Sequence, residues 1–299
     1  RQSFRSTKPK GPSWRPIKDK FSGCCSQLLL SAVRTCCCKG DGLLTLVKVI
    51  SLDLMKPEMS LLVFTDLDGT LLSHNGYSWD AARPALKRIA DIDAGIVLAS
   101  SKTGPEMSTL REDMGLQHWP AIVENGAGLL EPYATAVFNA SPYAQLRADL
   151  MKIPANIRDC FWGFGDMDLT EIRSRTGLSH ADAQRAQQRA FSEPGVWLGT
   201  TDQKDEFLYH LAKFGIAARE GGRFLTLSFG QTKADQMALI TSRFGPRHTI
   251  ALGDAPNDIE MLEAADVGVI IANPHKSPLP LLKGETAGRI TRTTHEGPK

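Results

Sequence analysis

A pair of carboxylates early in the chain has the spacing of a metal-binding catalytic centre. Asp66 and Asp68 stand in an Asp-x-Asp-Gly-Thr motif directly after the apolar run 61–64. On an extended chain, side chains at i and i+2 project the same way. Two carboxylates held close together repel each other, and one pKa rises unless a cation lies between them. A Mg²⁺ ion, which takes oxygen ligands and keeps several waters, suits such a pair.

A second acidic pair, Asp254 and Asp258, follows another apolar run, 249–252. An isolated Asp-x-Asp is more often a turn or a helix cap than a functional site. Two acidic clusters that each end a strand of one parallel sheet are a different case, because ligands bind beyond the carboxyl ends of such strands. The second pair is therefore expected to complete the metal site. Further polar clusters follow two other apolar runs, at 100–103 and 124–126.

Strands and helices alternate around these clusters from residue 60 onward. The predicted strands are 61–64, 95–99, 121–123, 249–252 and 267–271. The predicted helices are 80–91, 104–114, 233–244 and 256–264. Short apolar strands that alternate with helices indicate a parallel sheet covered on both faces. The expected fold class is therefore α/β, with a Rossmann-like parallel-sheet core.

The middle of the chain has a different pattern. Residues 137–222 contain scattered aromatic side chains and an Ala/Gln/Arg-rich helix near 179–190, and no further strand there ends in an acidic cluster. This segment is interpreted as an inserted α/β domain. The catalytic core would then consist of residues 59–136 and 223–299.

Composition excludes several classes of protein. The 299 residues are 42% hydrophobic and 23% charged, which argues against a disordered or fibrous chain. The formal net charge of +2 is uneven, since residues 1–58 hold 11 Lys/Arg against 4 Asp/Glu while the rest holds 24 against 29. The acidic remainder has no electrostatic footprint for nucleic acid. No apolar run reaches the roughly 18 residues of a membrane helix.

Residues 1–58 are expected to lie outside the working fold. They begin with Arg1, contain prolines, scattered basic residues and cysteine clusters, and keep no helical or strand period. They are interpreted as a disordered extension, or as sequence upstream of a true start near Met59. Five of the 6 cysteines lie there, and Cys160 is the sixth. A remainder with one thiol closes no internal disulfide, which fits the reducing cytoplasm.

Four motifs together resemble those of the haloacid dehalogenase superfamily of phosphotransferases. They are the Asp66 motif, Ser100 after the second strand, Lys233 at the start of a later helix, and Gly-Asp-x-x-Asn-Asp at 253–258. They occur in the family's order, and the resemblance covers about residues 60–295. It implies that Asp66 is the nucleophile that forms an aspartyl-phosphate. It implies that Asp68 is the general acid and then the general base.

The same resemblance implies the remaining groups of the centre. Mg²⁺ would be held by the Asp66 side chain, the Asp68 backbone carbonyl and Asp254, with Asp258 in support. Ser100 and Lys233, with Ser101 beside them, would bind the phosphoryl oxygens.

A finer resemblance points to mannosyl-3-phosphoglycerate phosphatases. It rests on Tyr-Ser-Trp at 77–79, Ser-Ser-Lys-Thr at 100–103, Glu-Asn-Gly-Ala at 124–127, Phe-Ser-Glu-Pro at 191–194, Gly-Arg-Phe at 222–224 and Glu-Gly-Pro at 296–298. The long gap between Ser100 and Lys233 places the cap between the second and third motifs, which is the family's C2 type. This resemblance implies hydrolysis of 2-O-(α-mannosyl)-3-phosphoglycerate to mannosylglycerate, a compatible solute.

Several residues are candidates for contact with the substrate. Lys102 lies next to the phosphate pocket, and Asn125 is expected at the sheet edge, whereas Glu124 is expected to be structural. Glu193 is a candidate for sugar hydroxyls and Arg223 for the glycerate carboxylate. Arg185 and Arg189 are expected on a solvated face of the cap helix.

Other functions remain open at this point. The main rivals are phosphatases of glucosyl-3-phosphoglycerate, sucrose phosphate or sugar phosphates in general. A phosphomannomutase and a non-catalytic binding module are more distant alternatives. The expected partner is a small sugar phosphate, without nucleic acid or membrane, and the expected assembly is a monomer or a homodimer.

Overall fold

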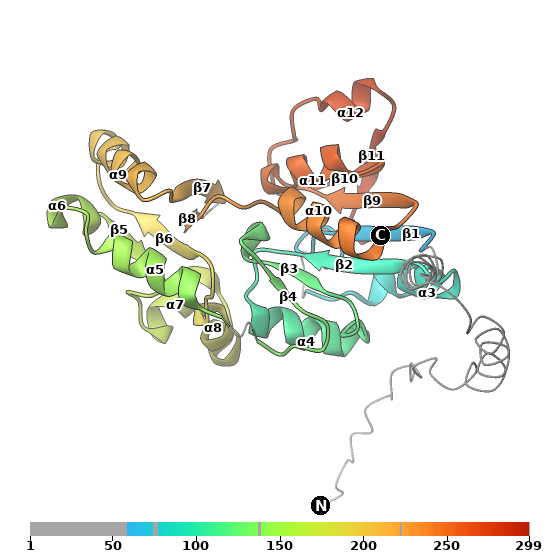
Figure 1. The fold of residues 1–299 in the computed structure, drawn as a ribbon, viewed down its shortest axis with the longest axis horizontal. Helices are drawn as coiled ribbons and strands as arrows, with labels where there is room; N and C mark the ends of the chain where they lie inside the picture. The colour runs from blue at the N-terminus through green and yellow to red at the C-terminus, as the bar shows by residue number, and fades with distance from the viewer. Residues whose placement is uncertain (1–58, 74–76, 137–138, 222, 299) are drawn as a thin grey trace, which may run out of the picture. The chain divides into compact units, whose positions relative to one another are not determined.

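The computed structural model describes residues 59–73, 77–136, 139–221 and 223–298 (Figure 1). The chain divides into two compact units, 1–58 and 59–299, and every described residue belongs to the second. The interpretation of residues 1–58 as an extension therefore lies outside the described residues. None of the helices among the described residues has the length and apolar character needed to cross a membrane.

The larger sheet has seven strands in the order β11-β10-β9-β1-β2-β3-β4. Its neighbours are parallel except β3 and β4, which pair antiparallel at one edge. This arrangement confirms the predicted α/β class with a Rossmann-like parallel sheet. The strands are β1 (Leu61–Thr65), β2 (Gly95–Ala99), β3 (Ala121–Val123), β4 (Gly128–Leu130), β9 (His248–Gly253), β10 (Val267–Ala272) and β11 (Ile290–Glu296).

Helices cover both faces of this sheet, because β1 is apolar on both. The helices of this region are α3 (Arg83–Asp91), α4 (Gly104–Met114), α10 (Lys233–Phe244), α11 (Ile259–Ala264) and α12 (Lys283–Thr286). Leu62 and Phe64 pack with α10 and α11 on one face, and Val63 packs with α3 and α4 on the other. Short 3₁₀ turns lie at Asp80–Ala82, Glu124–Gly126 and Pro256–Asp258.

Capping residues fix where the two helices nearest the strand ends begin. Thr103 caps α4 in a reciprocal capping box with Glu106, and Thr232 caps α10 in the same way with Asp235. Each helix ends at a glycine in the left-handed region. Lys233 is therefore held at the first position of α10.

A second sheet is inserted between β4 and α10. We call residues 139–221 and 223–228 the insert. Its sheet is antiparallel in the order β5-β6-β8-β7. The strands are β5 (Phe161–Gly163), β6 (Glu193–Trp197), β7 (Ala217–Gly221) and β8 (Phe224–Ser228). The helices are α5 (Ser141–Leu150), α6 (Ala155–Arg158), α7 (Leu169–Thr176), α8 (His180–Gln187) and α9 (Thr201–Lys213).

Two strands of the larger sheet were not predicted from the sequence. β4 is three residues long and pairs antiparallel, so it lacks the strand-then-helix pattern of its neighbours. β11 exposes most of its residues, so its sequence lacks a continuous apolar run. The predicted helix 256–264 begins as a 3₁₀ turn at Pro256–Asp258 before α11.

Candidate active site

The two acidic motifs meet at the carboxyl ends of neighbouring strands. β1 and β9 run parallel in register, with Thr65 beside Leu252, and the Asp66 N–H donates to the Leu252 carbonyl at 2.9 Å. Side-chain oxygens of Asp66, Asp254 and Asp258 lie within 4.8 Å of one another, and all three residues are buried. The geometry thus brings together carboxylates that are almost 190 positions apart in the chain.

Lys233 lies between two of these carboxylates. Its ammonium donates to Asp66 Oδ1 at 2.6 Å and to Asp258 Oδ1 at 2.7 Å, and its side chain is completely buried. Burial alone would lower the pKa of this lysine, but the attraction of Asp258 and Asp66 outweighs it and raises the pKa. Lys233 is therefore a fixed positive charge beside Asp66.

Burial is the largest influence on the pKa of Asp66. Desolvation raises the pKa of its carboxyl to about 7, against the lowering effect of Lys233, and the charges of Asp258 and Asp254 raise the pKa further. A low-dielectric site that holds several carboxylates disfavours ionisation of each of them. The pocket around Asp66 consequently favours additional positive charge.

Asp254, the second carboxylate of the cluster, has hydrogen-bond partners of its own. Its Oδ2 accepts hydrogen bonds from the Asn273 amide and, at 3.0 Å, from the Lys276 ammonium, while the Thr70 hydroxyl lies 3.5 Å from Oδ1. Sequence reasoning missed Asn273 and Lys276, although Asn273 lies two positions after the predicted strand 267–271. The position of Asn273 after a parallel strand is a signal that could have identified it.

The donor set of this cluster fits Mg²⁺. Carboxylate and carbonyl oxygens are the ligands that this hard cation takes in proteins. When all three buried carboxylates are ionised, the ammonium groups of Lys233 and Lys276 leave one negative charge in excess. Asp258 differs from the other two carboxylates, because its Oδ2 already accepts the N–H groups of Asp254 and Ala255.

Ser100 and Asn125 lie in the loops that follow β2 and β3, respectively. Ser100 is buried, its carbonyl accepts the Asn125 N–H at 2.9 Å, and its Oγ accepts the Lys102 N–H at 3.3 Å. Asn125 Oδ1 in turn accepts from the Asn257 amide at 2.9 Å. Hydrogen bonds therefore connect the loops that carry the second and fourth motifs.

Gly126 explains why the Glu-Asn-Gly stretch fits here. It has a φ of 92°, and a Cβ at this position would lie 2.0 Å from the carbonyl carbon of Thr232. Its carbonyl accepts from the Gln236 amide at 3.0 Å. Only a glycine lets the loop approach the start of α10 this closely, so Gly126 helps to seat Lys233.

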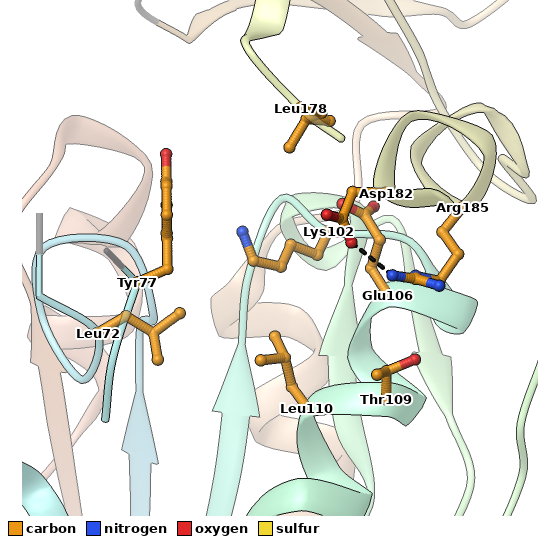
Figure 2. A pocket seen from close by; sticks show the side chains of 9 residues that line it. All are labelled: Leu72, Tyr77, Lys102, Glu106, Thr109, Leu110, Leu178, Asp182 and Arg185. Atoms are coloured by element: carbon orange, nitrogen blue, oxygen red, sulfur yellow. Dashed lines mark hydrogen bonds and ion pairs between the residues drawn. The ribbon is translucent and has the colours of Figure 1, made fainter. Parts of the chain in front are cut away.

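Asp68 is not part of this buried cluster, and its carboxylate pairs with Lys102. Both of its carboxylate oxygens accept from the Lys102 ammonium, at 3.0 and 2.8 Å, and its side chain is 38% exposed. Burial lowers the pKa of Lys102, but the charge of Asp68 and the hydrogen bond to it outweigh burial, so that the pKa is raised. Lys102 and residues of the insert line a cavity of about 210 Å³ (Figure 2).

Glu124 joins the insert to the active-site loops. This fully buried carboxylate accepts the N–H groups of Ala190 at 2.8 Å, Phe191 at 3.2 Å and Ser192 at 2.7 Å, and also the Ser192 hydroxyl at 2.7 Å. The Arg189 guanidinium lies 3.3 Å from it, with a side chain only 6% exposed. The expectation that Arg189 is solvated is therefore wrong. We call this set of contacts the Glu124 clasp.

Replacing Glu124 by glutamine should loosen this clasp. The amide nitrogen would face backbone donors, so at least one buried N–H would lose its acceptor. We expect the free energy of unfolding to fall by at least about 2 kcal/mol, measured by urea titration. We expect kcat/KM to fall about tenfold, because the loop of Asn125 and the insert would both shift.

Glu131→Gln is the matched control for this experiment. Glu131 forms an exposed ion pair with Arg243, which contributes about 1 kcal/mol or less. If Glu124→Gln is no less stable than this control, the clasp does not hold the insert.

Three further candidate residues make their hydrogen bonds to groups outside the carboxylate cluster. Ser101 is exposed, and its carbonyl accepts from Arg189 at 3.4 Å. Glu193 is fully buried within the insert, where it accepts the Gly165 N–H at 2.7 Å and burial raises its pKa. Arg223 is exposed at the turn between β7 and β8, and it donates to the Arg175 carbonyl at 3.0 Å. Among the described residues, no hydrogen bond or ion pair links Glu193 or Arg223 to Asp66, Asp68, Ser100, Lys233 or Asp254.

Solved structures share this fold. One is the phosphatase BT1666 from Bacteroides thetaiotaomicron, 20% identical, with a TM-score of 0.56 over 80% of this chain and 91% of that chain. Another is the sucrose-phosphatase from Synechocystis sp. PCC6803, 16% identical, with a TM-score of 0.53 over 80% and 93%. A third is the subclass IIB sugar phosphatase BT4131, 18% identical, with a TM-score of 0.51 over 78% and 94%.

The sequence itself matches a family model for haloacid dehalogenase-like hydrolases. The match covers residues 63–169 and 229–286, which is more than half of the chain. It includes Asp66, Asp68, Ser100, Lys233 and Asp254, the residues whose side chains or loops meet in the geometry above. With the parallel sheet and the carboxylate cluster at its strand ends, this match places the chain in the haloacid dehalogenase-like hydrolase family.

Proposed function

We propose that this protein is a phosphatase that hydrolyses phosphoric monoesters through an aspartyl-phosphate on Asp66. The observation that carries the proposal is the placement of Asp66. It lies 2.6 Å from the buried Lys233 ammonium and within 4.8 Å of Asp254, while Asp68, two residues further on, is part-exposed and pairs with Lys102. A nucleophile, a fixed positive charge and an acid/base group thus stand at one sheet edge.

The first half-reaction transfers the phosphoryl group to the protein. An Asp66 carboxylate oxygen attacks phosphorus, and the bond between phosphorus and the leaving oxygen breaks. Asp68, protonated, gives its proton to the leaving oxygen, which departs as an alcohol. Lys233 and the Ser100 hydroxyl neutralise and bind the phosphoryl oxygens as their charge redistributes.

The second half-reaction restores Asp66. Asp68, now a carboxylate, takes a proton from a water molecule, whose oxygen attacks phosphorus. The bond between phosphorus and Asp66 breaks and inorganic phosphate leaves. The side chain of Asp68 is 38% exposed, in contrast to the burial of Asp66, which suits it to meet both the leaving group and this water.

The acidic cluster is the proposed Mg²⁺ site. Asp66 and Asp254 would supply carboxylate oxygens and Asp68 its backbone carbonyl, and Asp258 would hold Lys233 and the loop after β9 in place. Bound there, the ion would supply positive charge to the phosphoryl oxygens.

The proposed substrate class is a sugar phosphate, with mannosyl-3-phosphoglycerate as the specific candidate. The substrate proposal rests on the Ser-Ser-Lys-Thr, Glu-Asn-Gly-Ala and Phe-Ser-Glu-Pro stretches of the sequence. Two of the structurally similar proteins support the wider class: one is a sugar phosphatase and the other a sucrose-phosphatase in complex with sucrose and phosphate. We propose further that the insert acts as the cap that covers the substrate.

Metal dependence tests the proposed reaction. The purified protein should release phosphate from mannosyl-3-phosphoglycerate with Mg²⁺, and EDTA should abolish this activity because the buried carboxylates would lose their counter-charge. Phosphate release is measured by a colorimetric assay with p-nitrophenyl phosphate in parallel. If the mannosyl ester is turned over no faster than p-nitrophenyl phosphate, the proposed substrate is wrong. If EDTA leaves the activity unchanged, the proposed dependence on Mg²⁺ is wrong.

A further inference from the structure

The pocket beside Asp68 is built from both the core and the insert. Its core wall consists of Leu72, Tyr77, Lys102, Glu106, Thr109 and Leu110. Its insert wall consists of Leu178, Asp182 and Arg185 (Figure 2). Because Lys102 lines the cavity and binds Asp68, the cavity adjoins the proposed acid/base group.

The position of this pocket fits the part of the substrate that leaves. Asp68 must touch the leaving oxygen in order to protonate it. The rest of the leaving group therefore extends from Asp68 into the adjoining space. The side chains of this pocket are then the groups that distinguish one phosphate ester from another.

The insert wall carries a cation with free donor capacity. The Arg185 guanidinium donates from Nη2 to Asp182 Oδ1 at 2.5 Å, and within the described residues this is the one hydrogen-bond partner of its side chain. A guanidinium has further N–H donors in a planar fork that matches a carboxylate. Lys102, the other cation of the pocket, already binds both oxygens of Asp68.

The insert is held so that Arg185 stays at this wall. The Thr103 hydroxyl, at the start of α4, donates to the Arg185 backbone carbonyl at 2.9 Å. The Arg185 side chain is 32% exposed, so it is accessible from the cavity without being fully solvated. The docking contact uses the backbone, which means that a substitution of the side chain leaves it in place.

Asp182 and the apolar side chains complete the wall. The Ser179 hydroxyl donates to Asp182 Oδ2 at 2.6 Å, and this bond is the largest cause of the lowered pKa of Asp182. The charge of Lys102 also lowers that pKa, so the two walls act on each other electrostatically. An ionised carboxylate accepts hydrogen bonds from hydroxyl groups, while Leu72, Leu110 and Leu178 give the cavity apolar surface.

We propose that this pocket receives the leaving group and that Arg185 selects esters whose leaving group carries a carboxylate, with Asp182 accepting from its hydroxyls. This inference rests on the proposed phosphatase function and assigns the specificity of the same site. It transfers to Arg185 the role that sequence reasoning gave to Arg223. A hydroxy acid is the class of leaving group that fits both charges, because its carboxylate would accept from Arg185 and its hydroxyl would donate to Asp182.

A matched pair of esters tests the selection. 3-Phosphoglycerate and glycerol 3-phosphate differ in that a carboxylate replaces a hydroxymethyl group. In Arg185→Gln, kcat/KM for 3-phosphoglycerate and mannosyl-3-phosphoglycerate should fall by about tenfold to a hundredfold, since a charge-assisted pair is lost. The values for glycerol 3-phosphate and p-nitrophenyl phosphate should change by less than about threefold.

Two further variants separate selection from folding. Arg185→Lys should retain part of the preference, because it keeps the charge and loses the fork. Arg173→Gln removes an exposed arginine of α7 outside the pocket. It should leave kcat/KM unchanged for all four substrates. An equal loss on all substrates in Arg185→Gln, or no loss on any, overturns the proposal.

A binding measurement keeps the inference independent of turnover. Calorimetric titration of the Asp66→Asn protein, with and without Arg185→Gln, compares the Kd of 3-phosphoglycerate with that of glycerol 3-phosphate. The arginine variant should weaken binding of 3-phosphoglycerate alone. If the native protein hydrolyses no ester, the proposed function fails, and this titration still decides whether Arg185 recognises a carboxylate.

Discussion

Asparagine in place of Asp66 is expected to abolish phosphate release while the protein remains folded. The change removes the attacking oxygen of the proposed nucleophile and keeps its shape, so the amide oxygen can still accept from Lys233, which lies 2.6 Å from Oδ1. Turnover should fall by about four orders of magnitude or more, as it does when the nucleophile of a covalent mechanism is lost. A steady-state assay of phosphate release, with far-UV circular dichroism on the same sample, measures both effects.

The control for this variant is Asp91→Asn. Asp91 is exposed and pairs with Lys87 one helical turn away, so its loss should change neither turnover nor the dichroism spectrum. Single-turnover mixing with ³²P-labelled ester adds a direct readout, because the native protein should carry label on an acid-stable, base-labile acyl phosphate and the Asp66 variant should carry none. Retention of more than about one hundredth of the native rate by the Asp66 variant would exclude Asp66 as the nucleophile.

The site residues that are positioned by the order of the strands could be predicted from the sequence. Asp66 and Asp254 each follow a continuous apolar run, and parallel strands bring their carboxyl ends to one edge. Lys233 follows Thr232 at a helix start, which is also a local signal. The core sheet and the carboxylate cluster could therefore be anticipated without coordinates.

The contacts of residues that are positioned by packing of the insert could not be predicted from the sequence. The expected structural role of Glu124 agrees with its four hydrogen bonds to residues 190–192, but the sequence did not predict these partners, which lie more than 60 positions away. Arg185 was expected to be solvated, yet α8 docks on α4 and turns it toward Asp68's pocket. Such contacts arise from tertiary packing, which leaves no periodic signal in the sequence.

The insert contacts the two core loops that carry Ser100 and Asn125. The segment 185–192 contacts the loop after β2 through Thr103 and Ser101, and the loop after β3 through Glu124. We therefore expect a change in the position of the insert to shift the proposed phosphate-binding loop as well as the pocket wall.

Methionine in place of Lys233 is expected to reduce both activity and stability. It leaves the buried carboxylates of Asp66 and Asp258 without the ammonium that lies 2.6 and 2.7 Å from them. Removing one partner of a buried ion pair costs about 3–5 kcal/mol, to be measured by urea unfolding in EDTA. Loss of this fixed charge at the phosphoryl oxygens should reduce kcat about a hundredfold to a thousandfold.

The stability deficit of this variant should grow with pH from about 7 upward. In the native protein burial raises the pKa of Asp66 to about 7 from 3.8, and Lys233 works against that rise. Without the lysine the pKa of Asp66 is higher still, so the folded variant binds a proton above pH 7 that the unfolded chain has released. Stability falls with pH wherever the folded state binds more protons. The lysine itself is not the cause, because its pKa is raised above 10.5 and it stays charged between pH 6 and 8 in the native protein.

Lys87→Met separates this effect from a general loss of charge. Lys87 forms an exposed pair with Asp91, which contributes about 1 kcal/mol or less, and its removal should produce no deficit that grows between pH 6 and 8. A Lys233 variant that is as stable as this control at pH 8 in EDTA would mean that the carboxylates of Asp66 and Asp258 do not depend on the buried ammonium. The role of Lys233 as the fixed positive charge of the active site would then have to be abandoned, because a cation that can be removed from among buried carboxylates without cost is not holding them ionised.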